Sequence, residues 1–248
     1  MAATTSGKDK VLRWTRVLFG PYDLSGDART YGGADLTFSE APNWGWSNSV
    51  MGVLAGSTRT VGIRDFQALF NDASGKSWET MVGGALWPVS MLFGGGGEPA
   101  IPDPAYLMDA VQIGSAITFD SDIGVISGSL LPRSGGSSGN PLGVVLANQA
   151  LTVTASLASH DNEGATTNGW MANLHVLVSS GGDWAFDIEH SSNDSTWTTL
   201  GSFTIDASTV DAESISGTGT VNQYVRLTAT RTAGTCTVAV TFSRNYGN

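Results

Sequence analysis

Apolar and polar residues alternate along the second half of the chain. Residues 184–188, 225–229 and 236–242 each place an apolar residue at every second position. A period of two with one apolar face is typical of antiparallel strands that are buried on one side. Ala233 and Gly234, between the last two segments, predict a hairpin turn. The apolar face comprises Trp184, Phe186, Ile188, Val225, Leu227, Ala229, Cys236, Val238, Val240 and Phe242.

The first half carries strand-like segments with a weaker period. Residues 11–19, 35–39, 80–93 and 106–119 predict further strands, because they are rich in apolar and β-branched residues. Residues 40–60 lack a clear period and predict a long loop. A loop of that length within a domain is usually functional or makes contacts.

One segment of the first half has helical spacing. Ile63, Phe66 and Phe70 are separated by three and four residues, which places them on one face of a helix. An Asn-Asp-Ala-Ser-Gly run follows and would end it. We therefore predict one short helix over residues 62–71.

A glycine- and serine-rich stretch divides the chain into two halves. Residues 134–141, Ser-Gly-Gly-Ser-Ser-Gly-Asn-Pro, have the composition of a linker. We predict a first β domain over residues 9–133 and a second β-sandwich domain over residues 142–248. Residues 1–8 are small and polar, and we expect them to form a flexible N-terminal arm.

The composition favours an all-β protein. Glycine accounts for 32 of the 248 residues, and 14% of residues are charged, against about 25% in an average protein. Hydrophobic residues make up 41%, which is enough for a core and excludes an intrinsically disordered chain. We expect an all-β fold, an antiparallel β-sandwich or barrel with one short helix.

The charge balance argues against a protein that grips nucleic acid. Twelve basic and 22 acidic residues give a net charge of −10, whereas holding a phosphate backbone requires clustered cations. The single cysteine, Cys236, allows no internal disulfide and no cysteine-based metal site. No segment approaches the roughly 18 apolar residues of a membrane span, so no membrane partner is expected.

The three histidines form no recognisable catalytic motif. His160 precedes Asp161, but the chain has no G-x-S-x-G nucleophile elbow. His175 and His190 lie within strand-like runs, which favours structural roles. The glycine run at residues 94–97 lacks the lysine that follows in a phosphate-binding loop.

Acidic residues give no metal motif either. Asp120 and Asp122 lack the D-x-D-x-D-G pattern of a calcium-binding loop. We therefore expect no catalytic residue, no cofactor and no metal ion, and a protein that is not an enzyme.

An ordered set of motifs carries a resemblance to a known family. Residues 186–203 contain His-Ser followed by a D-x-x-W-x-x-L-x-x-F pattern. Residues 224–227 and a valine-rich final segment ending at residues 242–244 follow in the same order. The chain is similar in these motifs to the tail tube proteins of long-tailed bacteriophages, and resembles a major tail tube protein of the non-contractile siphophage type. Further matching segments are residues 22–27, 126–128 and 172–176.

The resemblance implies a structural virion protein that assembles into stacked rings. Each ring would pool strands into an inner β-barrel, and genomic DNA would pass through the channel without specific binding. Trp44, Trp46 and Met51, in the predicted loop, are candidates for contacts between rings. Asp187 and Glu189, on a polar strand face, are candidates for lining the lumen, where carboxylates would repel DNA.

The resemblance leaves the ring composition open. Six single-domain chains would form a hexamer, whereas two tandem tube domains per chain would form a trimer with pseudo-six-fold symmetry. Other tail proteins would bind the ends of the tube. The protein would be located in the virion tail after assembly in the host cytoplasm.

Two other classes of protein share this composition. One is a different phage structural protein, such as a capsid decoration or baseplate protein. The other is a carbohydrate-binding or adhesion module, which would expose coplanar tryptophans and remain monomeric. Self-polymerisation distinguishes the tube subunit from both.

Overall fold

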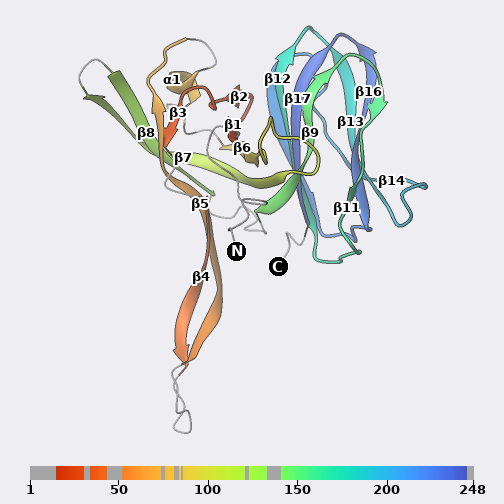
Figure 1. Cartoon of the computed structure of the whole chain (residues 1–248), viewed down its shortest axis with the longest axis horizontal. Helices are drawn as coiled ribbons and strands as arrows, with labels where there is room; N and C mark the ends of the chain where they lie inside the picture. Colours follow the sequence, from red (N-terminus) through yellow and green to blue (C-terminus); the bar gives the residue numbers. More distant parts are fainter. Residues whose placement is uncertain are drawn as a thin grey trace, which may run out of the picture.

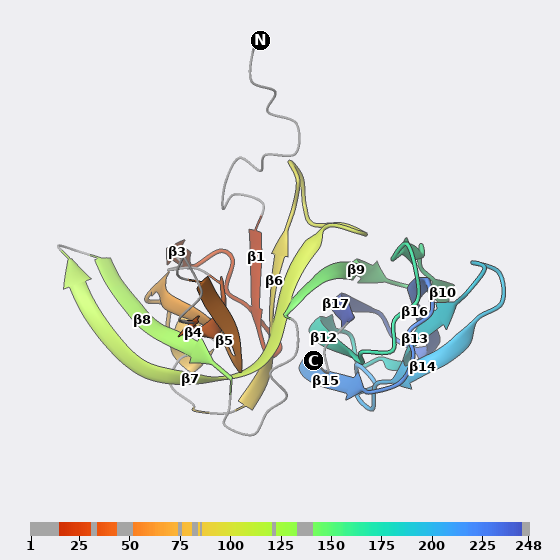
Figure 2. The same cartoon turned by 90° about the horizontal axis from the view of Figure 1, so that it is seen from below.

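The computed structural model describes residues 15–30, 34–43, 52–73, 76–80, 84, 86–120, 123–132 and 141–244. This part of the chain is almost entirely antiparallel β-strand with one short helix, α1 (Ser77–Thr80), which confirms the all-β class. Figures 1 and 2 show two lobes side by side, the first built from β1–β8 and the second from β9–β17. No helix in the described part is long and apolar enough to cross a membrane.

The first lobe contains strands of very different length. The two longest strands, β5 and β7, each pair with more than one other strand. The strands are β1 (Thr15–Phe19), β2 (Tyr22–Asp23), β3 (Ala28–Thr30), β4 (Ala34–Asn43), β5 (Gly52–Leu69), β6 (Leu86–Phe93), β7 (Pro104–Asp120) and β8 (Ile123–Leu131).

The second lobe is a sandwich of two sheets. Strands β15, β12, β17 and β9 belong to a 12-stranded sheet that continues into the first lobe, and they face a five-stranded sheet of β10, β11, β16, β13 and β14. The strands are β9 (Leu142–Leu151), β10 (Ala155–Ser156), β11 (His160–Asp161), β12 (Trp170–Ser179), β13 (Asp183–Ser191), β14 (Thr198–Ser202), β15 (Asp211–Gly217), β16 (Tyr224–Ala233) and β17 (Cys236–Arg244).

The alternating apolar residues of the second half form the core of this sandwich, as the sequence predicted. Phe186, Leu227 and Val240 are fully buried in one cluster. The ring of Trp170 stacks on that of Phe242 with their centroids 6.2 Å apart. The predicted turn joins β16 to β17, where Gly234 adopts a positive φ of 65°.

The two lobes are joined by hydrogen-bonded strands as well as by packing. β7 pairs with β9, and Ala105 lies opposite Gly143. A Cβ on Gly143 would meet the Phe242 carbonyl oxygen at 2.1 Å, so the close approach of β17 requires glycine here. An apolar cluster drawn from both lobes lies beside this junction: Leu18, Leu92, Ala105, Val145 and Ala239.

The predicted helix over residues 62–71 is wrong, because β5 runs through most of it. A β-bulge between Ile63 and Phe66 inserts an extra residue opposite β8, and Asp65 adopts a positive φ of 50° there. The bulge brings Ile63, Phe66 and Ala68 into one buried cluster. It therefore produces a spacing of three residues between buried positions, which imitates a helical pattern.

The predicted loop over residues 40–60 is also wrong at both of its ends. β4 and β5 form an antiparallel hairpin, with Phe38 opposite Arg59 and Asn43 opposite Gly52. Figure 1 shows this hairpin extending away from the rest of the first lobe. These residues are strands because β4 and β5 pair with each other, and such pairing is not encoded by a local apolar period.

Several predicted boundaries lie outside the described residues. These include the N-terminal arm at residues 1–8 and all of the predicted linker except Pro141. The Pro141 carbonyl oxygen accepts a hydrogen bond of 2.8 Å from the Leu107 amide of β7.

Candidate functional site: an assembly surface and an end pocket

The outer half of β7 is exposed along its whole length. Every residue from 113 to 119 is exposed, including three large apolar residues. Ile113 is 54% exposed, Ile117 39% and Phe119 77%. Exposed apolar side chains grouped in this way are typical of surfaces that contact another molecule.

The apolar surface continues onto the neighbouring elements. Phe70 and Phe119 flank Gly124, where an added Cβ would meet them at 3.0 and 3.2 Å. The Phe70 ring lies 5.5 Å from that of Trp78 in α1. We call these exposed apolar side chains the β7 patch; they are Leu69, Phe70, Trp78, Ile113, Ile117 and Phe119, all at least 37% exposed. The strand pairing places Leu69 and Ile113 on one face of the sheet and Ile117 and Phe119 on the other, so the patch includes both faces.

One edge of β7 is open beside the patch. β6 pairs with β7 from Ala105 to Val111, and β8 pairs with the opposite edge from Val111 to Asp120. β6 does not extend past Val111. Within the described part of the chain, residues 112–120 therefore have no strand paired to that edge of β7. An edge of this kind presents unpaired N–H and C=O groups to which another strand can add.

Two bulges bend the sheet at the base of this surface. β7 shifts register between Ile113 and Ala116, where Gly114 has a positive φ of 69°. The bulge at Asp65 in β5 lies across β8 from it, and a depression of about 340 Å³ lies between the two bulges. Bulges increase local bend and twist, and Figure 2 shows β7 and β8 curving away from the body.

The predicted contacts between rings lie outside the described residues. Trp44, Trp46 and Met51 belong to the segment between β4 and β5. Their role stays a prediction.

The predicted lumen residues lie on the five-stranded sheet of the second lobe. Asp187 and Glu189 are two residues apart on β13. Asp187 accepts a hydrogen bond from the Ser202 hydroxyl on β14. β13 lies in the lobe opposite to the one that carries β7, so the structure does not bring these carboxylates to the β7 patch.

The charge of Glu189 is compensated within the sheet. Its Oε2 lies 2.7 Å from Arg226 NH2 and accepts a 2.7 Å hydrogen bond from the Thr228 hydroxyl. The guanidinium carbon of Arg226 lies 4.0 Å from the centre of the Trp197 ring. Trp197 is thus half-buried beneath an arginine, whereas Trp184 is 2% exposed in the core.

His175 belongs to a buried polar layer between the lobes. Its Nδ1 lies 2.7 Å from the Gly20 carbonyl oxygen and its Nε2 lies 2.9 Å from the Ser90 hydroxyl. Because a carbonyl only accepts, Nδ1 carries the proton and Nε2 accepts from Ser90. Ser90 in turn lies 2.9 Å from the Thr241 hydroxyl, so β6, β12 and β17 are tied together.

The same layer contains the buried side chain of Asn173. It donates a 3.0 Å hydrogen bond to the Val89 carbonyl oxygen across the junction. Burial lowers the pKa of His175 to about 4, with a smaller lowering from the charge of Arg16 and opposing effects from the Gly20 carbonyl and Asp23. His175 is therefore neutral and structural at neutral pH.

The charged pair nearest to this layer is Arg16 and Asp23. Arg16 forms an ion pair with Asp23 and also donates to the Asn148 side chain of the second lobe. Burial raises the pKa of Asp23, but the charge of Arg16 and hydrogen bonds from Ser25 outweigh it and hold the pKa below its usual value.

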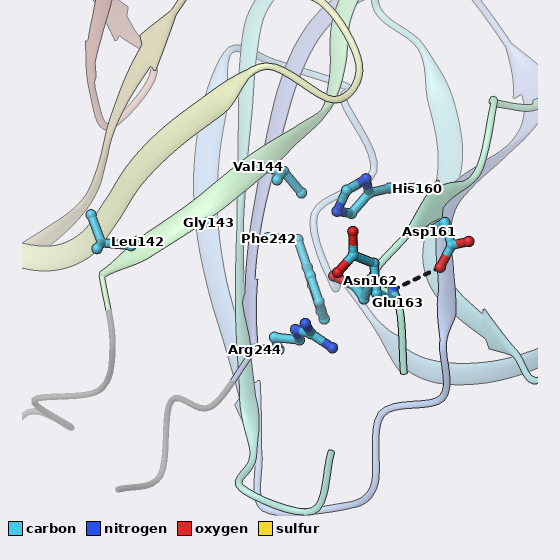
Figure 3. A pocket seen from close by; sticks show the side chains of 9 residues that line it. All are labelled: Leu142, Gly143, Val144, His160, Asp161, Asn162, Glu163, Phe242 and Arg244. Atoms are coloured by element: carbon cyan, nitrogen blue, oxygen red, sulfur yellow. Dashed lines mark hydrogen bonds between the residues drawn. The ribbon is translucent and has the colours of Figure 1, made fainter. Parts of the chain in front are cut away.

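The other two histidines lie in the second lobe. His190 Nδ1 accepts a 3.1 Å hydrogen bond from the Asn222 amide, and burial lowers its pKa. His160 lines a pocket of about 370 Å³ at the end of the sandwich. We call it the end pocket; Figure 3 shows its lining residues, Leu142, Gly143, Val144, His160, Asp161, Asn162, Glu163, Phe242 and Arg244.

Elements distant in the sequence build the end pocket. The start of β9, the strand β11 with the turn after it, and the end of β17 contribute its walls. Arg244 NH1 donates a 2.8 Å hydrogen bond to the Gly164 carbonyl oxygen, which fixes the guanidinium beside that turn. Burial lowers the pKa of His160, the charge of Arg244 lowers it further, and Asp161 opposes both.

The described residues contain no cluster of three or more histidine, cysteine or acidic side chains that could hold a metal ion. Cys236 is buried, which raises the pKa of its thiol to about 11. A thiol with so high a pKa is a poor nucleophile at neutral pH.

Comparisons with known proteins identify no family. No protein-family model and no curated protein matches the chain. Among solved structures, the chain is similar to the crystal structure of the SPP1 Dit protein, described as a paradigm of the hub adsorption apparatus in Gram-positive infecting phages. The match has 8% identity and a TM-score of 0.36, and covers 94% of this chain and 99% of that chain. At this TM-score the likeness carries no argument about function.

Proposed function

We propose that the protein is a structural, non-enzymatic component of a phage tail, and that it is the major tail tube subunit. It polymerises into stacked rings that form the channel for DNA ejection. The observation that carries the proposal is the outer half of β7, which combines an open strand edge with the exposed apolar β7 patch.

The sequence motifs support this class of protein. The His-Ser and D-x-x-W-x-x-L-x-x-F motifs of residues 186–203 are followed in order by the two closing strand segments. In the fold these motifs occupy β13, β14, β16 and β17 of the second lobe. The resemblance thus extends over four strands of one sandwich.

The β7 patch supports assembly through a neighbouring copy. A second chain that adds a strand to residues 112–120 would pair the open edge and cover Ile113, Ile117 and Phe119. Burial of apolar surface contributes about 25 cal/mol per Å², and strand pairing satisfies backbone groups along the same edge. A closed ring of such contacts leaves no free edge.

The β4–β5 hairpin supports stacking of one ring on the next. It extends beyond the body of the first lobe, as Figure 1 shows, and can therefore reach an adjacent ring. Trp44, Trp46 and Met51, which follow β4 and precede β5 in the sequence, are the contact residues we propose. Deletion of residues 43–55 should then abolish tube growth and leave single rings.

The acidic character of the chain supports a channel through which DNA slides. With a net charge of −10 the protein offers few cations to hold a phosphate backbone. Asp187 remains a candidate for the lumen surface. Glu189 is a weaker candidate, because Arg226 compensates its charge.

The test is assembly of a variant in which the β7 patch carries charge. We would replace Ile113 and Phe119 with lysine and measure sedimentation velocity across a concentration series. The double variant should remain small at concentrations where the unchanged protein forms large species. Lysine on a strand edge disfavours pairing with another strand.

A matched control separates the patch from a general effect of charge. Val153→Lys with Val210→Lys adds the same two charges at positions that are 64% and 49% exposed in the second lobe. This control should assemble as the unchanged protein does. If the variant with lysine at Ile113 and Phe119 forms species as large as the control does, the proposed role of the patch is refuted.

A further inference from the structure

We propose that the end pocket binds a carboxylate group, with the Arg244 guanidinium, the Asn162 side-chain amide and the His160 ring as its hydrogen-bond donors. The pocket lies apart from the β7 patch, in the other lobe. Its three donors come from β11, the turn after it and β17, so the ligand would bridge the two sheets of the sandwich.

Arg244 is the anchor of the proposed site. Its NH1 donates to the Gly164 carbonyl oxygen at 2.8 Å. No carboxylate of the described residues forms an ion pair with it, whereas Arg16 and Arg226 each have one. A guanidinium has five N–H donors in a planar fork that matches the two oxygens of a carboxylate.

Asn162 provides an independent sign of a missing acceptor. The residue lines the pocket and is only 8% exposed. Its Nδ2 is buried and has no hydrogen-bond acceptor among the described residues. Buried amide groups are nearly always hydrogen-bonded, so an unpaired one calls for an acceptor, and a ligand oxygen supplies it.

The acidic residues of the pocket leave room for a monoanion and disfavour a dianion. Asp161 Oδ1 accepts hydrogen bonds from the Glu163 amide at 2.7 Å and the Gln223 side chain at 2.9 Å. The Asp161 carboxylate is thus hydrogen-bonded to groups other than Arg244, Asn162 and His160, the three proposed donors. Glu163 is exposed at the rim. Both residues repel an anion, and they repel a phosphate with two charges about twice as strongly as a carboxylate with one charge, which Arg244 balances.

Two sources of this chemistry fit the pocket. One is a free small carboxylic acid, and the other is the side chain of a glutamate or aspartate on a partner segment. Both place a planar anion between Arg244 and Asn162. Acetate and a short blocked peptide distinguish them.

The experiment uses selective labelling of the histidine rings in the full-length protein. The chain has three histidines, so the NMR spectrum contains few ring signals. Acetate is titrated at constant ionic strength against chloride. A saturable shift of the His160 signal is expected, with His175 and His190 unchanged, because only His160 lines the pocket.

Variants and a matched control define the site. Arg244→Gln should weaken acetate binding at least tenfold, and Asn162→Asp should abolish it. Arg231→Gln is the control, because Arg231 also donates to a backbone carbonyl, that of Gly234, outside the pocket. It should change the affinity less than twofold. Arg244→Gln should also raise the pKa of His160 in the absence of acetate, because the charge of Arg244 lowers it. This measurement tests the proximity of Arg244 to His160 independently of acetate binding.

A second titration distinguishes a free small acid from an acidic side chain on a partner segment. The peptide acetyl-Gly-Glu-Gly-amide is compared with its glutamine counterpart. Binding of the glutamate peptide at least tenfold tighter than acetate assigns the pocket to a partner segment. Similar affinities assign it to a small acid. No saturable shift of His160 with either probe, or equal affinities for the unchanged protein and Arg244→Gln, would overturn the proposal.

Discussion

The buried His175 should make the stability of the protein sensitive to mild acid. Its pKa falls from an ordinary value of 6.5 in the unfolded chain to about 4 in the folded protein. Below pH 6.5 the unfolded chain gains a proton that the folded protein does not take up until about pH 4. Stability is therefore complete above pH 6.5, falls as the pH drops towards 4, and stays constant below it.

The size of the effect follows from the same two values. At about 1.4 kcal/mol for each pKa unit, the difference corresponds to a loss of about 3 kcal/mol, most of which has accumulated by about pH 4.5. The physical cause is burial, because the charge of a protonated ring would have no solvation by water in this layer, where His175 is fully buried.

The assay is urea unfolding followed by tryptophan fluorescence at several pH values between 7.5 and about 4.5. In His175→Gln the free energy of unfolding should fall by about 2–3 kcal/mol less over this range than in the unchanged protein. His190→Gln is the control and should leave most of the slope intact. Equal slopes for the unchanged protein and His175→Gln would refute the assignment of a neutral, buried ring between the lobes.

Further substitutions test the packing and the bulges, each by urea unfolding at neutral pH. Gly143→Ala should cost about 2–4 kcal/mol, because the new Cβ would meet the Phe242 carbonyl oxygen at 2.1 Å. Gly219→Ala, with nothing within 4 Å of the new Cβ, should change stability by less than about 0.5 kcal/mol. Phe186→Ala should cost about 3–5 kcal/mol, since the ring is fully buried in the sandwich core. Asp65→Gly should stabilise the protein by about 1 kcal/mol, because it relieves the positive φ of 50° in the β5 bulge; a loss of stability there would contradict the bulge.

The strands of the second lobe could be predicted because each has one buried face. The period of two at residues 184–188 and 225–229 follows directly from packing against a single core. The first lobe departs from that rule. The bulge in β5 changes the spacing of buried residues, and the β4–β5 ribbon is defined by the pairing of its two strands rather than by an apolar period. Both features depend on pairing with distant strands, which local pattern does not encode.

The candidate surfaces were less predictable than the strands. Residues 106–119 were correctly predicted as a strand, but exposure of its outer half depends on where β6 ends. The end pocket joins His160 and Asn162 to Arg244, about 80 residues away in the chain. One sequence signal was available, because Arg244 is one of only 12 basic residues in an acidic chain.

Assembly into a tube can be tested by negative-stain electron microscopy of the purified protein across a concentration series. We expect hollow tubes of uniform diameter with a regular axial repeat. End-on views would distinguish a trimer with pseudo-six-fold symmetry from a hexamer. If the protein stays monomeric at every concentration, and the variant with lysine at Ile113 and Phe119 behaves in the same way, it is not a tube subunit that assembles through β7.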